Sequence, residues 1–301
     1  MRVVFLGNQT VGVRTLQAIS ESAQVAGVVV HPPDPEDGVC YESVHDFASA
    51  KGWNLIRGKG RTPEVHQFVA AAKPDLLWIT DYRYLIPTEM IALAPLGAVN
   101  LHPSLLPTYR GRASLNWAIL NGERRLGLTA HFVDEGMDTG DIIEQASYEI
   151  SDDQDVGDCL DILYPLYGAI TRNVLRYFES GCVPRTPQDH SHATSFPRRR
   201  PQDGLIDWKK SARAIHRLVR AVAAPYPGAF TTLGDHKITI WKARVLSDTE
   251  STTVPGRVIA HCGTAPIVQC GEGTLSLTRI EKQVSHSTLR IGCQLGMGIA
   301  P

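Results

Sequence analysis

The chain has 301 residues, of which 43% are hydrophobic and 20% are charged. This composition is typical of folded globular proteins and excludes a largely disordered chain. The length suits one large domain, or a medium domain followed by a smaller one. The formal net charge of −1 gives no reason to expect that the whole chain binds nucleic acid.

The charge is unevenly distributed along the chain. Residues 1–204 carry 18 Lys and Arg against 25 Asp and Glu, a net charge of −7. Residues 205–301 carry 12 against 6, a net charge of +6. The basic C-terminal part is compatible with binding of an anionic ligand, although a mixed, solvated surface would give the same net charge.

Six cysteines are scattered through the chain without a C-x-x-C pair or a histidine at zinc-finger spacing. This pattern predicts reduced and mostly buried thiols and no metal site. The N-terminal segment reaches glycine too early for a signal peptide. No apolar run approaches the ~20 residues that span a bilayer. We therefore expect a cytoplasmic protein without a membrane segment.

Short apolar runs alternate with stretches of helical spacing in the first hundred residues. The expected strands are 3–6, 26–30 and 76–80, and the expected helices are 11–22, 43–51 and 88–93. Strands separated by helices predict a mostly parallel sheet, doubly wound and covered on both faces. The first turn, residues 7–12, lacks the G-x-G-x-x-G pattern, so the domain is expected to be Rossmann-like without binding a dinucleotide.

The remaining elements divide at a segment rich in proline, serine, histidine and arginine, residues 184–201. Before it we expect strands at 97–102 and 127–133 and helices at 113–121 and 156–180. After it we expect a helix at 211–223 and strands at 229–233, 237–245, 257–260, 267–270 and 274–280. The expected organisation is a catalytic domain, residues 1–203, and a smaller β-rich, OB-like domain, residues 204–301.

Two polar side chains stand at the end of the strand expected at 97–102. Asn100 and His102 are two positions apart, so on a strand they point to the same side. Ligands of open α/β sheets bind at this edge. An asparagine amide can donate to a developing oxyanion, and a histidine can move a proton. A histidine that is merely hydrogen-bonded near a strand end would show the same pattern.

A glycine-rich acidic loop follows the strand expected at 127–133. It contains Asp138 between two glycines and can place one carboxylate beside the histidine, where it would raise the pKa of the imidazole and orient it. An asparagine, a histidine and an aspartate together suit acyl transfer to an amine without a protein nucleophile. An acidic loop alone is more often a solvated turn.

Read together, residues 100–111 and 134–141 closely resemble the formyltetrahydrofolate-dependent formyltransferase family. The resemblance implies that Asn100, His102 and Asp138 are catalytic and that 10-formyltetrahydrofolate is the formyl donor. It also implies a folate pocket, lined by Tyr84, Leu85, Ile86, Arg112, Asp134, Glu135, Gly136 and Met137.

Three segments bear on the acceptor amine. The loop at 31–38 has three acids and neither lysine nor arginine, which disfavours a nucleic-acid acceptor. Residues 41–44 and 196–208 resemble the sugar N-formyltransferases of this family. That resemblance implies a small nucleotide-sugar substrate. Arg198 and Arg199 could bind its diphosphate, because guanidinium groups suit phosphate oxygens. Tyr109 lies near the expected site and could stack on a base or sugar, although an aromatic residue there is at least as often a packing residue. The same arginine run would also suit a solvated linker.

The leading hypothesis is therefore formyl transfer to the amino group of a nucleotide-linked amino sugar. Methionyl-tRNA formylation is the alternative, supported by the basic C-terminal part. A non-catalytic folate- or nucleotide-binding protein would not need Asn100 and His102 together. The sequence does not identify the nucleotide or the sugar, and it leaves open whether the chain forms a homodimer.

Overall fold

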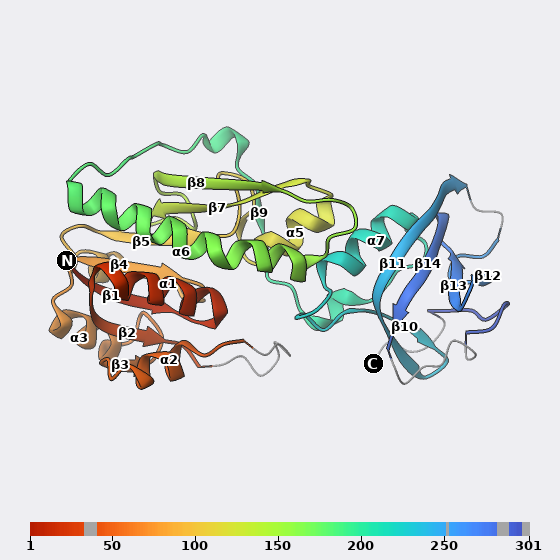
Figure 1. The fold of residues 1–301 in the computed structure, drawn as a ribbon, viewed down its shortest axis with the longest axis horizontal. Helices are drawn as coiled ribbons and strands as arrows, with labels where there is room; N and C mark the ends of the chain where they lie inside the picture. Colours follow the sequence, from red (N-terminus) through yellow and green to blue (C-terminus); the bar gives the residue numbers. More distant parts are fainter. Residues whose placement is uncertain (33–40, 251–252, 282–288, 297–301) are drawn as a thin grey trace.

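The computed structural model describes residues 1–32, 41–250, 253–281 and 289–296. Figure 1 shows two sheets that lie end to end along the long axis of the molecule, with the helices of the first half grouped around the first sheet. The segment between the helices α6 (Val156–Ser180) and α7 (Ala212–Ala221) runs past the first sheet before it enters the second part.

The larger sheet has seven strands in the order β3-β2-β1-β4-β5-β7-β8. β5 pairs antiparallel with β7 and β7 with β8, whereas the other neighbours are parallel. The strands are β1 (Arg2–Gly7), β2 (Gln24–Val30), β3 (Leu55–Arg57), β4 (Leu76–Thr80), β5 (Ala98–His102), β7 (Arg125–Phe132) and β8 (Ile142–Glu149). This arrangement confirms the mostly parallel α/β fold, although β3 and β8 were not among the expected strands.

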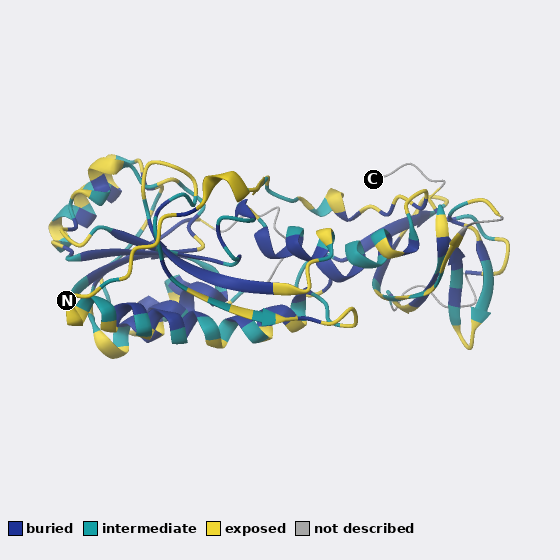
Figure 2. Ribbon diagram, turned by 90° about the horizontal axis from the view of Figure 1, so that it is seen from above, coloured by how far each residue is buried: buried dark blue, intermediate teal, exposed yellow. Residues whose placement is uncertain are grey.

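Helices cover both faces of this sheet. Val3 and Phe5 of β1 belong to one hydrophobic cluster, and Val4 and Leu6 belong to another, because alternate residues of a strand face opposite sides. The first cluster is covered by α1 (Gln9–Ser22), α2 (Val44–Ala50), α5 (Ser114–Asn121) and α6 (Val156–Ser180); the second by α3 (Pro63–Ala72) and α4 (Thr88–Ile91). Figure 2 shows the buried strands between these helical layers. The helix α3 was not expected.

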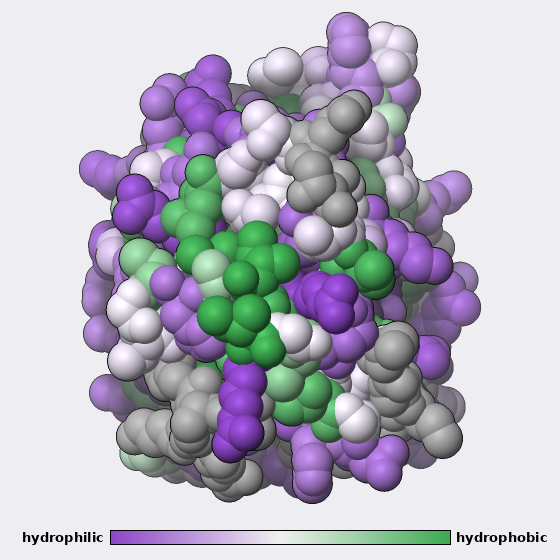
Figure 3. Space-filling view, turned by 90° about the vertical axis from the view of Figure 1, so that its right-hand side faces the viewer, coloured by the Kyte–Doolittle hydropathy of each residue, from purple (hydrophilic) through white to green (hydrophobic). Residues whose placement is uncertain are grey.

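The C-terminal part is a five-stranded antiparallel sheet, which confirms the expected β-rich domain. Its order is β10-β11-β14-β13-β12. It contains α7 (Ala212–Ala221), β10 (Ala229–Leu233), β11 (His236–Glu250), β12 (Val258–Cys262), β13 (Ala265–Gln269) and β14 (Glu272–Ile280). Figure 3 shows hydrophobic surface at this end of the molecule. The domain boundary near residue 204 stays a prediction.

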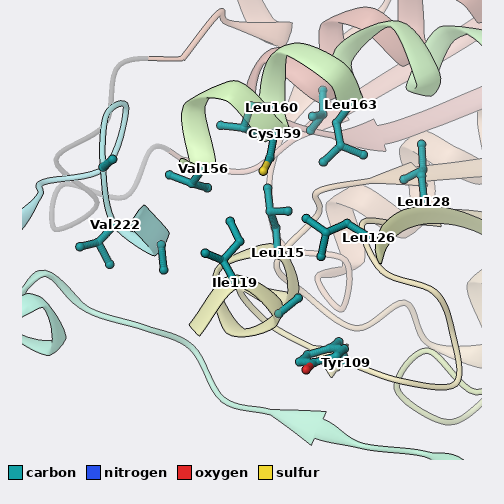
Figure 4. Close-up of a cluster of buried hydrophobic side chains, with 14 of the residues drawn as sticks. Tyr109, Leu115, Ile119, Leu126, Leu128, Val156, Cys159, Leu160, Leu163 and Val222 are labelled. Carbon is teal, nitrogen blue, oxygen red and sulfur yellow. The ribbon is translucent and has the colours of Figure 1, made fainter. Parts of the chain in front are cut away.

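The two parts share a packed core where α5, α6 and the end of α7 meet. Figure 4 shows Leu115 and Ile119 from α5 pointing toward Val156 and Cys159 at the start of α6, with Val222 beside them. All these side chains are buried. The start of α6 is fixed by a capping box, in which the Asp155 carboxylate accepts from two backbone N–H groups.

The structure bears on two expectations from the sequence, which concern the cysteine thiols and membrane-spanning segments. The five cysteines that the structure describes are free, but only Cys159 and Cys270 are buried, while Cys182 and Cys262 are exposed. The expectation of mostly buried thiols was therefore wrong for these two. Among the described residues, no helix combines the length and apolarity needed to cross a bilayer.

Candidate active site

The structure brings Asn100, His102 and Asp138 together at the end of β5. The His102 side chain is 6% exposed and that of Asp138 is 12% exposed. The Nδ1 atom of His102 lies 3.5 Å from Oδ2 of Asp138, and Nδ2 of Asn100 lies 3.3 Å from Oδ1. Asp138 therefore lies against both of the other residues that the sequence singled out, although it is 38 positions from Asn100.

Asp138 is held in place by the backbone as well as by its side chain. Its φ of +56° is in the left-handed region, which a non-glycine residue adopts at a cost and keeps only with support. The Gly111 N–H donates to Oδ2 at 2.9 Å, and the Gln188 side-chain amide donates to the Asp138 carbonyl at 2.9 Å. Burial opposes ionisation of Asp138, but the neighbouring His102 and His131 and the Gly111 N–H outweigh it and hold the pKa of this carboxyl well below its usual range.

The hydrogen bonds of His102 assign its proton-accepting atom. Nε2 lies 2.8 Å from the Tyr109 carbonyl oxygen, which can only accept, so Nε2 carries a hydrogen. In the neutral ring the lone pair is then on Nδ1, the atom that faces Asp138. Burial lowers the pKa of His102 below its ordinary value, although the Asp138 carboxylate opposes this shift. A neutral His102 can therefore take up a proton on Nδ1 and be stabilised by Asp138 when charged.

A second histidine, His131, completes the cluster and was not found from the sequence. It lies on β7, directly opposite Asn100 in the register of β5 and β7, and is 2% exposed. Its Nδ1 is 2.7 Å from the Phe132 carbonyl oxygen, so Nδ1 carries the hydrogen and Nε2 accepts. Nε2 is 3.1 Å from Nδ2 of Asn100, which therefore identifies the amino end of that amide.

The orientation of Asn100 has a chemical consequence. Its amino group faces both His131, at 3.1 Å, and Asp138, at 3.3 Å. To donate to an oxyanion, the amide must exchange the longer of these bonds for one to the new acceptor. The signal that could have revealed His131 is a histidine between two apolar residues, Ala130 and Phe132, in the expected strand that follows the one with Asn100.

A second hydrogen-bonded group supports the loop that leaves β5. The Thr129 hydroxyl donates to the Ser104 carbonyl at 2.6 Å and accepts from the Leu106 N–H at 3.2 Å. The Gln145 side-chain amide donates to the Leu106 carbonyl and to the Thr129 hydroxyl, each at 2.9 Å. These contacts fix the direction in which the chain leaves His102. Thr129 lies on β7 and Gln145 on β8, and no motif marks either of these two residues in the sequence.

One cavity, of about 380 Å³, opens directly onto the three residues. Pockets that bind small molecules typically measure ~300–1,000 Å³. Several predicted residues line this cavity: Tyr84, Leu85, Arg112, Met137, Arg198 and Arg199. The linker that carries the two arginines therefore contributes to the same cavity as the end of β5, although nearly a hundred residues separate them.

A second cavity, of about 690 Å³, lies beside the first and shares Leu85 with it. Its lining includes Ile86, Asp134, Glu135 and Gly136, which the sequence assigned to the folate pocket. The Asp134 carboxylate accepts from the Gly136 N–H at 3.0 Å and from the Thr139 hydroxyl at 2.5 Å. The loop that forms this wall is therefore folded around its own aspartate.

Two other predicted features stand apart from the cavities. Tyr109 is not among the residues that line the first cavity; its hydroxyl donates to Glu123 at 2.8 Å, and its ring stacks on Phe196. Its role as a substrate residue stays a prediction. Most of the acidic loop at 31–38 lies outside the described residues.

Two family models match the chain. Residues 1–163 match the formyl transferase model, and residues 199–288 match the model of the formyl transferase C-terminal domain. The first match alone covers more than half of the chain and contains all four residues of the cluster.

Individual relatives agree with these matches. A methionyl-tRNA formyltransferase of Acetivibrio thermocellus is 36% identical over 286 residues, covering 93% of this chain and 92% of the relative. The crystal structure of WlaRD, a sugar 3N-formyl transferase in the presence of dTDP and 5-N-formyl-THF, has a TM-score of 0.68 at 19% identity, over 93% of this chain and 98% of that one.

An N-formyltransferase from Helicobacter canadensis, in complex with folinic acid and dTDP-3-aminofucose, has a TM-score of 0.65 at 18% identity, over 91% and 98% of the two chains. At these identities the two structures show a shared fold. The family models and the 36% identical relative also establish the family of the chain. The chain belongs to the formyl transferase family and is an enzyme of its formyltetrahydrofolate-dependent group.

Proposed function

We propose that this enzyme transfers a formyl group from 10-formyltetrahydrofolate to the amino group of a nucleotide-linked amino sugar. One observation carries the proposal: Arg198 and Arg199 line the same cavity as Asn100, His102 and Asp138. Guanidinium groups bind phosphate oxygens through paired hydrogen bonds. A cavity with arginines beside an acyl-transfer cluster suits a small acceptor that carries a diphosphate.

The second cavity suits the folate donor. Its walls combine apolar residues, such as Ile86 and Val133, with the acidic segment 134–136. A flat, polar heterocycle needs this mixture, because its faces are apolar and its edges require hydrogen bonds. Since Leu85 lines both cavities, a donor held in the second can present its formyl group to an amine held in the first.

The catalytic roles follow from the hydrogen bonds of the cluster. The amine nitrogen adds to the formyl carbon, and His102 Nδ1 accepts the proton that the amine loses. Asp138 stabilises the resulting imidazolium at 3.5 Å. Asn100 donates to the oxygen that becomes negative, a contribution typically worth ~10²–10³ in rate. His102 then returns the proton to the folate nitrogen as its bond to the formyl carbon breaks.

The relatives support the proposal in part. WlaRD and the Helicobacter canadensis enzyme, with sugar or sugar-nucleotide acceptors in their descriptions, match this chain over nearly its whole length. The sequence likeness of residues 41–44 and 196–208 to the sugar N-formyltransferases points the same way.

Methionyl-tRNA formylation is the second candidate. It is favoured by the relative from Acetivibrio thermocellus, which is 36% identical across 93% of the chain. The net charge of +6 in residues 205–301 is also compatible with an RNA backbone. Against it stands the absence of lysine and arginine from residues 31–38.

The test is an acceptor screen with 10-formyltetrahydrofolate, in which products are identified by mass. The acceptors are UDP-4-amino-4-deoxy-arabinose, a dTDP-linked 4-amino sugar, a dTDP-linked 3-amino sugar and methionyl-tRNA. We expect one formyl group to be added to a nucleotide sugar, and no formylation by the His102→Ala enzyme. Formylation of methionyl-tRNA alone would overturn the acceptor assignment and leave the catalytic cluster standing.

The arginines are tested separately from the catalytic cluster. Arg198→Gln is expected to raise KM for the nucleotide sugar at least tenfold while KM for the folate changes little. Arg176→Gln is the matched control, because Arg176 is exposed on α6 and is not among the residues that line the cavity. Equal effects of the two substitutions would show that Arg198 does not bind the acceptor.

A further inference from the structure

The backbone of residues 109–111 forms hydrogen bonds with both His102 and Asp138. The Tyr109 carbonyl accepts from His102 Nε2 at 2.8 Å, and the Gly111 N–H donates to Asp138 Oδ2 at 2.9 Å. Tyr109 and Gly111 have φ values of +59° and +93°. Because the left-handed region is costly for a non-glycine residue, this segment needs external support to keep its shape.

That support comes from the linker between α6 and α7. The strand β6 (Arg110–Gly111) pairs in parallel with β9 (Ser195–Phe196). The Thr194 hydroxyl accepts from the Tyr109 N–H at 2.9 Å, and the Thr194 carbonyl accepts from the Arg110 N–H at 2.8 Å. Thr194 of the linker thus accepts from the N–H groups on both sides of the Tyr109 carbonyl, and this carbonyl orients His102.

The linker also holds the loop of Asp138 from its other end. Gln188 donates to the carbonyl oxygens of Asp138, at 2.9 Å, and Gly140, at 2.7 Å. Its own side-chain oxygen accepts from Arg110 at 2.6 Å. Gln188 therefore ties the Asp138 loop to the β6 segment.

A stack of side chains extends from this point to the arginines of the acceptor cavity. The Phe196 ring stacks on Tyr109, with centroids 5.0 Å apart and planes at 13°, and on Trp117, at 5.2 Å and 29°. The Arg199 guanidinium lies 4.9 Å from the centroid of the Trp117 ring. The residues that would meet the acceptor and those that orient His102 are thus parts of one packed unit.

We infer that residues 188–199 of the linker are a positioning element of the active site, with Thr194 and Phe196 fixing the geometry of His102 and Asp138. The inference rests on the catalytic roles given under the proposed function. It assigns to the connection between the domains a part in positioning the catalytic residues, in addition to the acceptor binding proposed for Arg198 and Arg199. Thr194 is exposed, so its side chain can be changed without disturbing the hydrophobic core.

The first test compares Thr194→Val with Thr194→Ser, using the acceptor that the screen identifies. Valine removes the hydroxyl that accepts from the Tyr109 N–H, while serine keeps it. We expect Thr194→Val to lower kcat by roughly 10- to 100-fold, the effect of misplacing a catalytic group by about 1 Å. KM for the folate should change less than twofold, and Thr194→Ser should keep a kcat near that of the wild type.

A pH profile separates positioning from general destabilisation. The Tyr109 carbonyl favours the protonated form of His102 and so raises its pKa. If Thr194→Val loosens this contact, the acid limb of kcat should move to lower pH. The matched control is Thr231→Val, which removes the acceptor of the Trp208 indole N–H and should leave kcat and the acid limb unchanged, because Thr231 lines neither cavity.

Phe196→Leu tests the stacked side chains. Leucine keeps an apolar side chain but loses the two ring contacts, so kcat should fall and KM for the acceptor should rise together. A wild-type kcat in both Thr194→Val and Phe196→Leu, with His102→Ala inactive, would overturn the inference. Retained activity in His102→Ala would instead overturn the catalytic roles under the proposed function.

Discussion

Replacing Asp138 with asparagine tests the proposal that this carboxylate stabilises a charged His102. Asparagine has nearly the same volume and keeps an oxygen for the Gly111 N–H, which donates to Asp138 at 2.9 Å. The substitution removes the charge that faces His102 Nδ1 at 3.5 Å, and it replaces Oδ1, which accepts from Asn100 Nδ2 at 3.3 Å, with an amino group. Loss of activity in Asp138→Asn therefore reports the lost charge together with the lost hydrogen bond to Asn100.

The distance sets the size of the expected effect. Two unit charges 3.5 Å apart attract by about 5 kcal/mol at an effective dielectric constant of about 20. Each 1.36 kcal/mol corresponds to about tenfold in rate. Since the dipole of the asparagine recovers part of this attraction, we expect kcat to fall by about 10³-fold.

The assay measures kcat and its pH dependence by the mass of the formylated product. Because Asp138 raises the pKa of His102 against the effect of burial, Asp138→Asn should also move the acid limb of kcat to lower pH. A folded Asp138→Asn enzyme with less than a tenfold loss of kcat would refute the reasoning. So would an acid limb that moved to higher pH.

Three further predictions concern stability. The lowered pKa of the Asp138 carboxyl stabilises the folded state at pH values above 3.8, the usual carboxyl pKa, and this stabilisation is lost as the pH falls below 3.8. Any advantage in Tm of the wild type over Asp138→Asn should therefore shrink between pH 6 and pH 3. Gly140→Ala would place Cβ 2.0 Å from the Phe132 carbonyl oxygen, so urea unfolding should show a loss of roughly 1–3 kcal/mol together with a raised KM for the folate. Trp208→Phe removes the 2.9 Å bond to Thr231 and should cost about 1–3 kcal/mol in urea without changing kcat.

The regular part of the fold could be predicted because its periodicity is strong. β4 consists of five fully buried residues between polar turns, and α6 combines an N-terminal cap with a long apolar stripe. β8 was missed because only one of its eight residues, Ile143, is buried, so the strand lacks a continuous apolar run. β3, at three residues, is too short for any period to show.

The candidate site also has residues that could be predicted from the sequence and residues that could not. Asn100, His102 and Asp138 lie in dense local motifs, so their proximity could be expected from the ends of neighbouring strands. His131 was missed because its role depends on strand register: it lies opposite Asn100 only because β5 and β7 pair antiparallel. Nothing in the local sequence fixes that direction, since the neighbouring pairs of the sheet are parallel.

The linker shows most clearly why local sequence is insufficient. β6 and β9 have two residues each and pair over a separation of 85 positions, so neither has a pattern of its own. So short a pair is stable only because its surroundings supply the remaining contacts, here the stacked rings of Tyr109, Phe196 and Trp117. The proline and arginine content of residues 184–201 predicts a linker, and in the structure this segment contains the short strand β9 and a 3-10 helix at His190–His192. Under the proposed roles, residues with the composition of a connection hold the backbone that orients His102, because Thr194 accepts from the N–H groups of both Tyr109 and Arg110.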